Sequence, residues 1–348
     1  MEKFFLKPLV VVPGDHLVEA IHDVDLSSRK GYDHKFLSKL VELPTLSTEL
    51  LSAVAVNQQP GRNGQNYLDY TNFSILFNRE MKLPFLTAVN IFGEQDELAI
   101  EHEQRTSDTW FQDERIKVQK DFFQFSNGDY AASGFQKGHM VRYYDPAWDA
   151  TEKIRKIAMG DTFHYTNCCP QLANFNAGVW NDLEDYYMSR AIFQDKKVTV
   201  FTGPIFNKAK RINKLLVPVN YWKVIVFIEK AELKAIGFII SHELAFEKLV
   251  QEKLLVAKTL VQPKLKKADI DRLFNNRNLK KWVVKINLIE EKTGIRFNLN
   301  KVDVNKFRPK LFNKTPAEFD KEIAGIKGFA IPRMGSDITT DTEIIKNL

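Results

Sequence analysis

Residues 134–140 read Gly-Phe-Gln-Lys-Gly-His-Met, in which a histidine directly follows a turn flanked by glycines. Two more polar stretches follow it closely. Residues 161–171 read Asp-Thr-Phe-His-Tyr-Thr-Asn-Cys-Cys-Pro-Gln, and residues 174–184 read Asn-Phe-Asn-Ala-Gly-Val-Trp-Asn-Asp-Leu-Glu. A histidine, several amides and a glutamate thus recur within about fifty residues. We expect the fold to be a scaffold that brings these three stretches together.

The composition is that of a globular protein with a modest excess of positive charge. With 348 residues the chain can form one large domain or two ordinary ones, and 44% hydrophobic residues suffice for a full core. The net charge of +6 is compatible with a polyanionic partner but does not require one. We find no apolar run of the length that spans a membrane and no signal-peptide pattern, so we expect a cytoplasmic protein without membrane association.

The only two cysteines are neighbours, Cys168 and Cys169. Disulfide geometry strains so short a ring, which argues against a bridge between them. We expect two small buried thiols in a reducing compartment.

Hydrophobic patterning predicts several hairpins beside a few helices. Aromatic and β-branched residues suit strands, and apolar residues at helical spacing suit helices. Because no alternation of strand, helix and parallel strand is seen, we predict an α+β fold. The expected strands are 67–78, 86–91, 197–203, 222–228 and 233–240, and the expected helices are 148–159, 177–193 and 289–294.

The strongest helix prediction is 177–193, in which Trp180, Leu183, Tyr187 and Ala191 fall on one face. Asparagines just before it are suited to cap its exposed amides. We divide the chain into an N-terminal extension (1–30), one functional domain (31–315) and a C-terminal tail (316–348).

Three residues in these stretches suit acid–base or metal chemistry, and each has a plainer interpretation. His139 can act as a general base near neutral pH, or it is simply a turn histidine. Asn176 can offer its amide oxygen to Mg²⁺, or it caps the helix. Glu184 can hold a water at a metal, or it is an ordinary surface glutamate.

Taken together, the stretches resemble the DNA/RNA non-specific endonucleases, the endonuclease G-like family. Residues 136–139 stand where that family has Asp-Arg-Gly-His, and 166–171 resemble its Ser-Asn-x-x-Pro-Gln. Residues 176–184 match its Asn-x-Gly-x-Trp-x-x-Leu-Glu at every anchor. The similarity continues in family order over roughly residues 31–300.

The resemblance implies a fold and a mechanism. It implies a mixed, largely antiparallel central sheet flanked by helices, with a ββα-metal (His-Me finger) catalytic motif. His139 would be the general base, Asn176 the direct ligand of Mg²⁺ (or Mn²⁺), and Glu184 a metal contact through water. Asn167 would position the surroundings of His139 or the waters of the metal. The expected substrates are DNA and also RNA, cut to leave 5′-phosphate ends.

Three departures from the family pattern leave an alternative open. Gln136 and Lys137 replace the aspartate and arginine of the hallmark, and Met188 replaces a frequent helix arginine. Lysine keeps the charge but loses the bidentate grip on phosphate. Phosphate contacts would then come from Lys137, Arg142 and Arg190, with Arg115 as a catalytic cation. The alternative is a catalytically weakened member that only binds nucleic acid.

Two further expectations concern partners. The basic stretch 264–285 is either a phosphate-tracking surface or a solvated helical face. A free nuclease endangers its own cell, so an inhibitor or activating partner is expected, as for a toxin or defence effector that is held inactive. A homodimer is compatible with the sequence.

Overall fold

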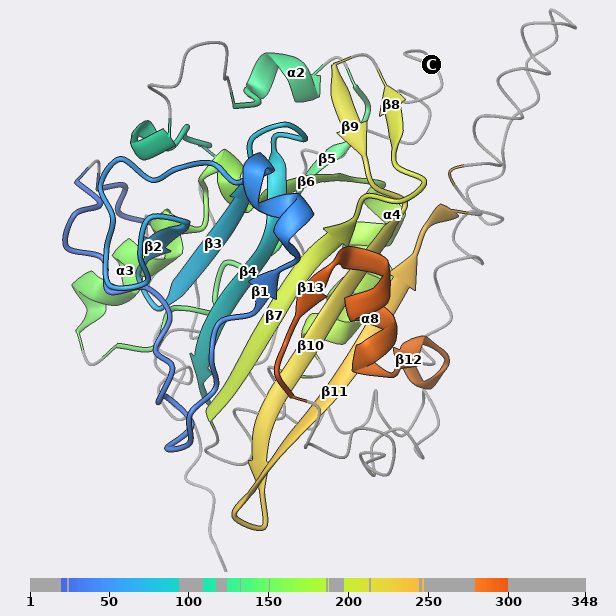
Figure 1. Ribbon diagram of the computed structural model, residues 1–348. Coiled ribbons are helices and arrows are strands. Elements are labelled where there is room, and N and C mark those ends of the chain that lie inside the picture. Colours follow the sequence, from blue (N-terminus) through green and yellow to red (C-terminus); the bar gives the residue numbers. More distant parts are fainter. Residues whose placement is uncertain are drawn as a thin grey trace, which may run out of the picture.

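A long antiparallel sheet is the scaffold of the computed structural model (Figure 1). Its strand order is β12-β11-β10-β7-β4-β3-β2, and every neighbouring pair is antiparallel. The predicted α+β class with a largely antiparallel central sheet is therefore confirmed. The structure describes residues 20–23, 25–93, 109–116, 124–131, 133–149, 151–185, 187, 197–212, 214–243, 246 and 279–299.

The first part of the sheet is a three-stranded meander. It comprises β2 (Tyr67–Tyr70), β3 (Phe73–Asn78) and β4 (Leu83–Phe92). The β3–β4 hairpin confirms the predicted pairing, but the single strand predicted over 67–78 is wrong. Asn72 takes a left-handed φ of 65°, which turns the chain back and makes two paired strands of that segment.

The second part is formed by the longest strands, β7 (Lys197–Ile205), β10 (Asn220–Glu229) and β11 (Glu232–Ser241). Lys230 and Ala231 join β10 to β11 with φ values of 50° and 62°, the left-handed pair that a tight hairpin needs. The predicted hairpin is confirmed, and each strand extends beyond its predicted ends. β7 continues through Pro204, which pairs with Tyr221.

The sheet is covered on both faces, and successive residues of β10 point alternately to each. Tyr221 and Ile225 belong to a large core on one face, whereas Trp222, Val224 and Val226 belong to a second core on the other. The second core is closed by α8 (Ile286–Thr293), which lies in front of the sheet in Figure 1. α8 confirms the short helix predicted here and ends at Gly294, whose φ is 71°.

The first core carries the polar stretches. Its helices include α3 (Glu152–Asp161), which begins four residues after the start predicted at 148, where the Thr151 side chain caps the first turn. α4 (Ala173–Phe175) continues directly into a π-turn, η4 (Asn176–Trp180), which Gly178 kinks with φ −108° and ψ −118°. The helix therefore begins before the predicted residue 177 and is kinked, and residues 181–185 continue it.

Short elements complete the described chain. They are β1 (Thr45–Leu46), η1 (Thr48–Ala53), η2 (Glu114–Ile116), α2 (Asn127–Ala131), β5 (Gln136–His139), η3 (Tyr165–Asn167), β6 (Cys168–Gln171), β8 (Lys210–Ile212), β9 (Leu215–Val217), η5 (Leu279–Trp282), β12 (Val283–Val284) and β13 (Ile295–Arg296). None of the described helices is long and apolar enough to cross a membrane.

The end of the predicted N-terminal extension packs on the domain. Leu26 and Arg29 are buried, and the Arg29 guanidinium donates to both carboxylate oxygens of Asp161 at 2.8 and 3.2 Å. Both cysteines are free and buried, as predicted. The predicted C-terminal tail lies outside the described residues.

Candidate active site

The histidine turn forms a small strand of its own. β5 pairs with β6 in an antiparallel ladder that sets His139 opposite Cys168 and Gln136 opposite Gln171. Strand β10 of the large sheet contacts this ribbon: the Tyr221 hydroxyl donates to the Pro170 carbonyl at 2.6 Å. The two-stranded ribbon is therefore anchored to the large sheet.

Gly138 is required by close packing between the two strands. A Cβ atom at this position would lie 2.1 Å from Oε1 of Gln171 and 2.8 Å from its Cγ. Only glycine lets the Gln171 side chain lie across the ribbon. Gly134, which precedes β5, has a left-handed φ of 77°. Both glycines that flank the turn are therefore required by the structure, Gly138 by close packing and Gly134 by its left-handed φ.

His139 lies in an aromatic enclosure. Its ring centroid is 4.6 Å from that of Trp110 and 5.1 Å from that of Phe163, which meets it edge-on. Only 5% of the residue is exposed. Packing of this kind holds the imidazole in one orientation, which a general base needs.

Asn167 fastens the chain just after His139. Its side-chain oxygen accepts from the Val141 amide, and its nitrogen donates to the carbonyls of Val141 and Thr162, each at 2.9 Å. Its carbonyl accepts from the Met140 amide at 2.9 Å. These bonds fit the first of its two predicted roles, positioning of the surroundings of His139.

Asn176 is connected directly to the histidine strand. Its Nδ2 donates to Oε1 of Gln136 at 2.9 Å, and the residue is 7% exposed. The interpretation of Asn176 as a helix cap is wrong, because its backbone amide already donates to the Leu172 carbonyl inside the helix. The amide nitrogen thus donates to Gln136, and the amide oxygen is the only atom of this side chain whose lone pairs can bind a cation.

Glu184 is buried rather than a surface residue, so the plainer interpretation fails. Its Oε1 lies 3.2 Å from Nζ of Lys223, a residue of β10 that is itself fully buried. Burial raises the pKa of Glu184 to about 7, although Lys223 and Arg142 oppose that shift. Burial also lowers the pKa of Lys223. Lys223 further donates to the Met140 carbonyl at 3.4 Å, next to His139.

Arg142 belongs to the same buried group of charges. It pairs with Asp185 at 2.8 Å, and its side chain is 12% exposed. Asp145 accepts from the Tyr187 hydroxyl at 2.8 Å. We call Arg142, Asp145, Glu184, Asp185 and Lys223 the buried charge cluster. It joins the helix of Glu184 to the segment after His139.

Lys137 is more accessible than these residues. Its ammonium donates to Oδ1 of Asn127 in α2 at 2.9 Å and lies 5.7 Å from the Trp110 ring centroid. It therefore shares Trp110 with His139 while remaining at the surface. This position suits the predicted contact with substrate phosphate.

Arg115 is engaged in a buried network. Its guanidinium pairs with Asp113 at 2.7 Å, donates to the Asp69 carbonyl at 2.6 Å and lies over the Tyr70 ring at 4.7 Å. Its donors thus hold η2 against β2, and its catalytic assignment rests on the resemblance alone. Arg190, Met188 and most of the basic stretch 264–285 lie outside the described residues.

The donor set fits a hydrated Mg²⁺. Asn176 offers an amide oxygen and Glu184 a carboxylate, and Mg²⁺ prefers oxygen ligands while keeping several waters. Within the described residues, no three His, Cys, Asp or Glu side chains gather as a metal cluster. Among the histidines outside the motif, His164 and His242 are buried core residues, and His102 lies outside the described residues.

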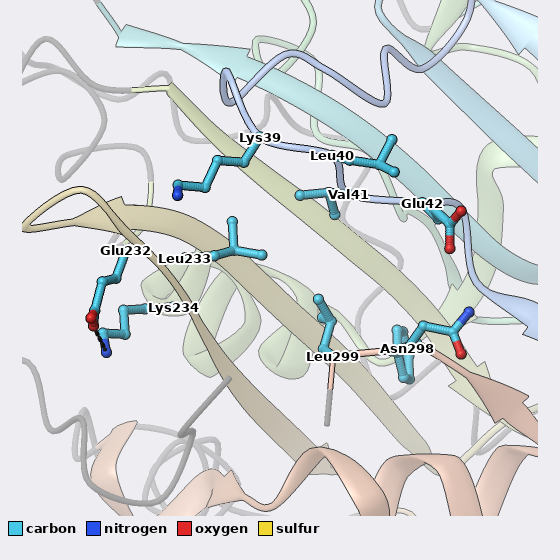
Figure 2. A pocket seen from close by; sticks show the side chains of 10 residues that line it. Lys39, Leu40, Val41, Glu42, Glu232, Leu233, Lys234, Asn298 and Leu299 are labelled. Atoms are coloured by element: carbon cyan, nitrogen blue, oxygen red, sulfur yellow. Dashed lines mark hydrogen bonds and ion pairs between the residues drawn. The ribbon is translucent and has the colours of Figure 1, made fainter. Parts of the chain in front are cut away.

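A pocket of about 640 Å³ lies elsewhere, on the α8 side of the sheet (Figure 2). Leu40, Leu233 and Leu299 line it. Two charged lining residues, Glu232 and Lys234, form an ion pair with each other at 2.8 Å. No residue of the three polar stretches lines this pocket. The surface at β5 is therefore the better candidate site.

Several site residues escaped sequence reasoning. Trp110, Asn127, Gln171 and Lys223 had no assigned role. Lys223 carried a signal, since it is a lone cation inside the apolar strand residues 221–226. Such a residue is expected to find a buried partner.

Comparison with known proteins shows the family of the chain. A family model described as DNA/RNA non-specific endonuclease matches residues 52–304. The uncharacterized protein y4fB of Sinorhizobium fredii is 31% identical over 68% of this chain and 38% of its own length. Mitochondrial nuclease 1 of Schizosaccharomyces pombe is 29% identical over 50% of this chain and 54% of its own length. Human mitochondrial endonuclease G is 31% identical over 29% of this chain and 36% of its own length.

The matches thus span about half or less of these relatives. Among solved structures, that of the EndoG/EndoGI complex is similar, with a TM-score of 0.48 at 19% identity over 67% of this chain and 85% of that chain. Since the family model covers well over half of the sequence, the chain belongs to the DNA/RNA non-specific endonucleases.

Proposed function

We propose that the protein is a metal-dependent endonuclease that hydrolyses phosphodiester bonds of DNA, and of RNA as a second substrate, with little sequence preference. Family membership supports nucleic acid as the substrate class. The hydrogen bond between Gln136 and Asn176 carries the assignment of roles. It ties the strand of the proposed base to the helix turn of the proposed metal ligand.

In this proposal, His139 takes a proton from the attacking water, and its aromatic neighbours hold the ring in place. Asn176 would hold Mg²⁺ through its amide oxygen, and Glu184 would hold a water beside it. When bound, the ion supplies charge stabilisation for the phosphorane and the leaving oxygen. Lys137 contacts the substrate phosphate, and the products carry 5′-phosphate ends. An inhibitor or activating partner is part of the proposal, because unregulated cleavage would damage the cell's own nucleic acid.

The test is cleavage of plasmid DNA in Mg²⁺, with and without EDTA. We expect nicked and linear products in Mg²⁺ and none in EDTA. His139→Ala should lower the rate by about 10² to 10⁴ while leaving DNA binding intact, because it removes only the base. His34→Ala is the matched control, because His34 contacts Asn63 and no residue of the site.

Two results would contradict this assignment. A His139→Ala rate within about threefold of the parent would exclude His139 as the base. A parent protein that binds DNA but cleaves it in neither Mg²⁺ nor Mn²⁺ would support the binding-only alternative, which Gln136 and Lys137 motivate.

A further inference from the structure

The β8–β9 hairpin segment concentrates positive charge and has no acidic residue of its own. Residues 207–220 contain Lys208, Lys210, Arg211 and Lys214 but no aspartate or glutamate. Lys208 pairs with Glu243 at 2.8 Å. The other three are exposed, and none forms an ion pair with a carboxylate of the residues that the structure describes.

A fourth cation comes from the turn between β3 and β4. Lys82 lies over the Phe125 ring at 5.8 Å. Burial lowers the pKa of Lys82, Asp129 opposes this shift, and Arg211 and Lys214 lower that pKa further. Arg211 and Lys214 therefore interact electrostatically with Lys82, although they are 129 and 132 residues away from it in the sequence.

These cations lie beside the candidate active site. β9 contacts β6, the partner strand of His139. In α2, Asn127 binds Lys137, and Asp129, two residues further on, is near enough to raise the pKa of Lys82. α2, β5, β6, β8 and β9 lie together at one end of the sheet in Figure 1. We call Lys82, Lys210, Arg211 and Lys214 the basic rim.

Like charges held together raise the free energy of the folded protein unless a counter-charge arrives. Asp129 acts on Lys82, but it is also engaged by Ser126, whose amide and hydroxyl donate to it at 2.9 and 2.8 Å. A polyanion is the ligand that best matches such a surface. A phosphodiester backbone also continues past any bond that is being cut, whereas a small anion would fill only one point of the rim.

We propose that the basic rim binds the phosphodiester backbone of the nucleic-acid substrate on one side of the cleaved bond. The inference rests on the proposed function, and it adds where the flanking backbone lies. Contacts of this kind carry no base information, so they serve an enzyme with little sequence preference. They also make affinity depend on salt: the logarithm of the binding constant falls with the logarithm of the salt concentration, with a slope of about −0.9 per phosphate contact.

The test reverses two charges, in Arg211→Glu/Lys214→Glu. The matched control is Lys230→Glu/Lys292→Glu, which reverses two exposed cations at the β10–β11 turn and in the last turn of α8. Binding to a short DNA duplex is measured in EDTA over a range of salt. We expect the rim variant to bind at least about tenfold more weakly and its salt slope to fall by about two units. The control should match the parent.

A second measurement distinguishes an effect on duplex binding from an effect on the active site itself. Cleavage of bis(4-nitrophenyl) phosphate in Mg²⁺ reports the active site with a diester too small to reach the rim, so the rim variant should retain the parent rate. Duplex affinity and salt slope equal to those of the control would overturn the inference. Loss of small-diester cleavage in the rim variant would overturn it too, because the residues would then act on the active site itself. A parent without any cleavage would contradict the proposed function alone, since the binding measurement still decides on the rim.

Discussion

At the residue scale, the two ends of the Asn176 side-chain amide differ in chemistry. The nitrogen donates to Gln136, so the oxygen is the end that can meet a cation. Asn176→Ala should weaken metal binding as well as lower the cleavage rate, and excess Mg²⁺ should restore part of the rate. Mn²⁺ binding measured by calorimetry checks the first effect, and Mg²⁺ titration of cleavage checks the second. The same loss of rate at every Mg²⁺ concentration, with unchanged Mn²⁺ binding, would exclude Asn176 as a ligand.

Lys137 and Gln136 depart from the family pattern together, and the structure gives each a contact of its own. Lys137 donates to Asn127, and Gln136 accepts from Asn176. Lys137→Arg restores the bidentate fork but disturbs the contact with Asn127. We therefore expect the single variant to be neutral or slower, and the double variant with Gln136→Asp to be faster, in plasmid cleavage. The opposite order, with the single variant fastest, would contradict this expectation.

At the element scale, the β5–β6 ribbon depends on the absence of a side chain at residue 138. Gly138→Ala would drive a methyl group into Gln171. We expect a loss of about 1–3 kcal/mol in the free energy of unfolding, measured in urea. In a Gln171→Ala background the same change should cost much less, because the obstacle is gone. Equal costs in both backgrounds would show that packing against Gln171 is not the reason for glycine.

Sequence patterns predicted the elements well where one physical cause dominates. The β10–β11 hairpin follows from apolar runs around a polar turn. The helix predicted over 148–159 is observed as α3, whose Thr151 cap places its start at Glu152. The pattern failed over 67–78, where aromatic residues continue across a turn that only the left-handed Asn72 creates. It also failed at the start of the Asn176 helix, since tertiary packing favours helical residues before 176 and Gly178 kinks the turn.

The candidate site was predictable as a set of residues but not as an arrangement. Motif spacing identified His139, Asn176 and Glu184. It could not show that Gln136 binds Asn176, or that Lys223 reaches Glu184, because these contacts join segments 40 and 39 residues apart. Such contacts depend on how β5, β10 and the helix lie together, which short-range patterns do not encode.

At the scale of the whole molecule, the buried charge cluster connects the large sheet to the active-site helix. It holds three carboxylates, on Asp145, Glu184 and Asp185, and two cations, on Arg142 and Lys223. With all five groups ionised the cluster carries a net charge of −1 in the interior, which is unfavourable. Uptake of one proton makes it neutral. This balance agrees with burial raising the pKa of Glu184 to about 7.

The raised pKa makes stability depend on pH in a defined direction. Glu184 has a pKa of 4.5 when unperturbed and about 7 in the fold, so between these values the folded state binds more protons than the unfolded chain. Its contribution to stability is therefore complete below pH 4.5 and is lost as pH rises through about 7. Glu184→Gln cannot titrate and should lack this loss.

Urea unfolding at pH 5 and pH 8 measures the effect. From pH 5 to pH 8, we expect the free energy of unfolding of the parent to fall by about 1–3 kcal/mol more than that of Glu184→Gln. Glu291→Gln, an exposed position on α8, is the control and should follow the parent. If the parent and Glu184→Gln change equally with pH, Glu184 is ionised throughout, and Lys223 and Arg142 then outweigh its burial. In that case the cluster keeps its negative charge at pH 5, and the carboxylate proposed to hold a water at the metal is available over the whole range.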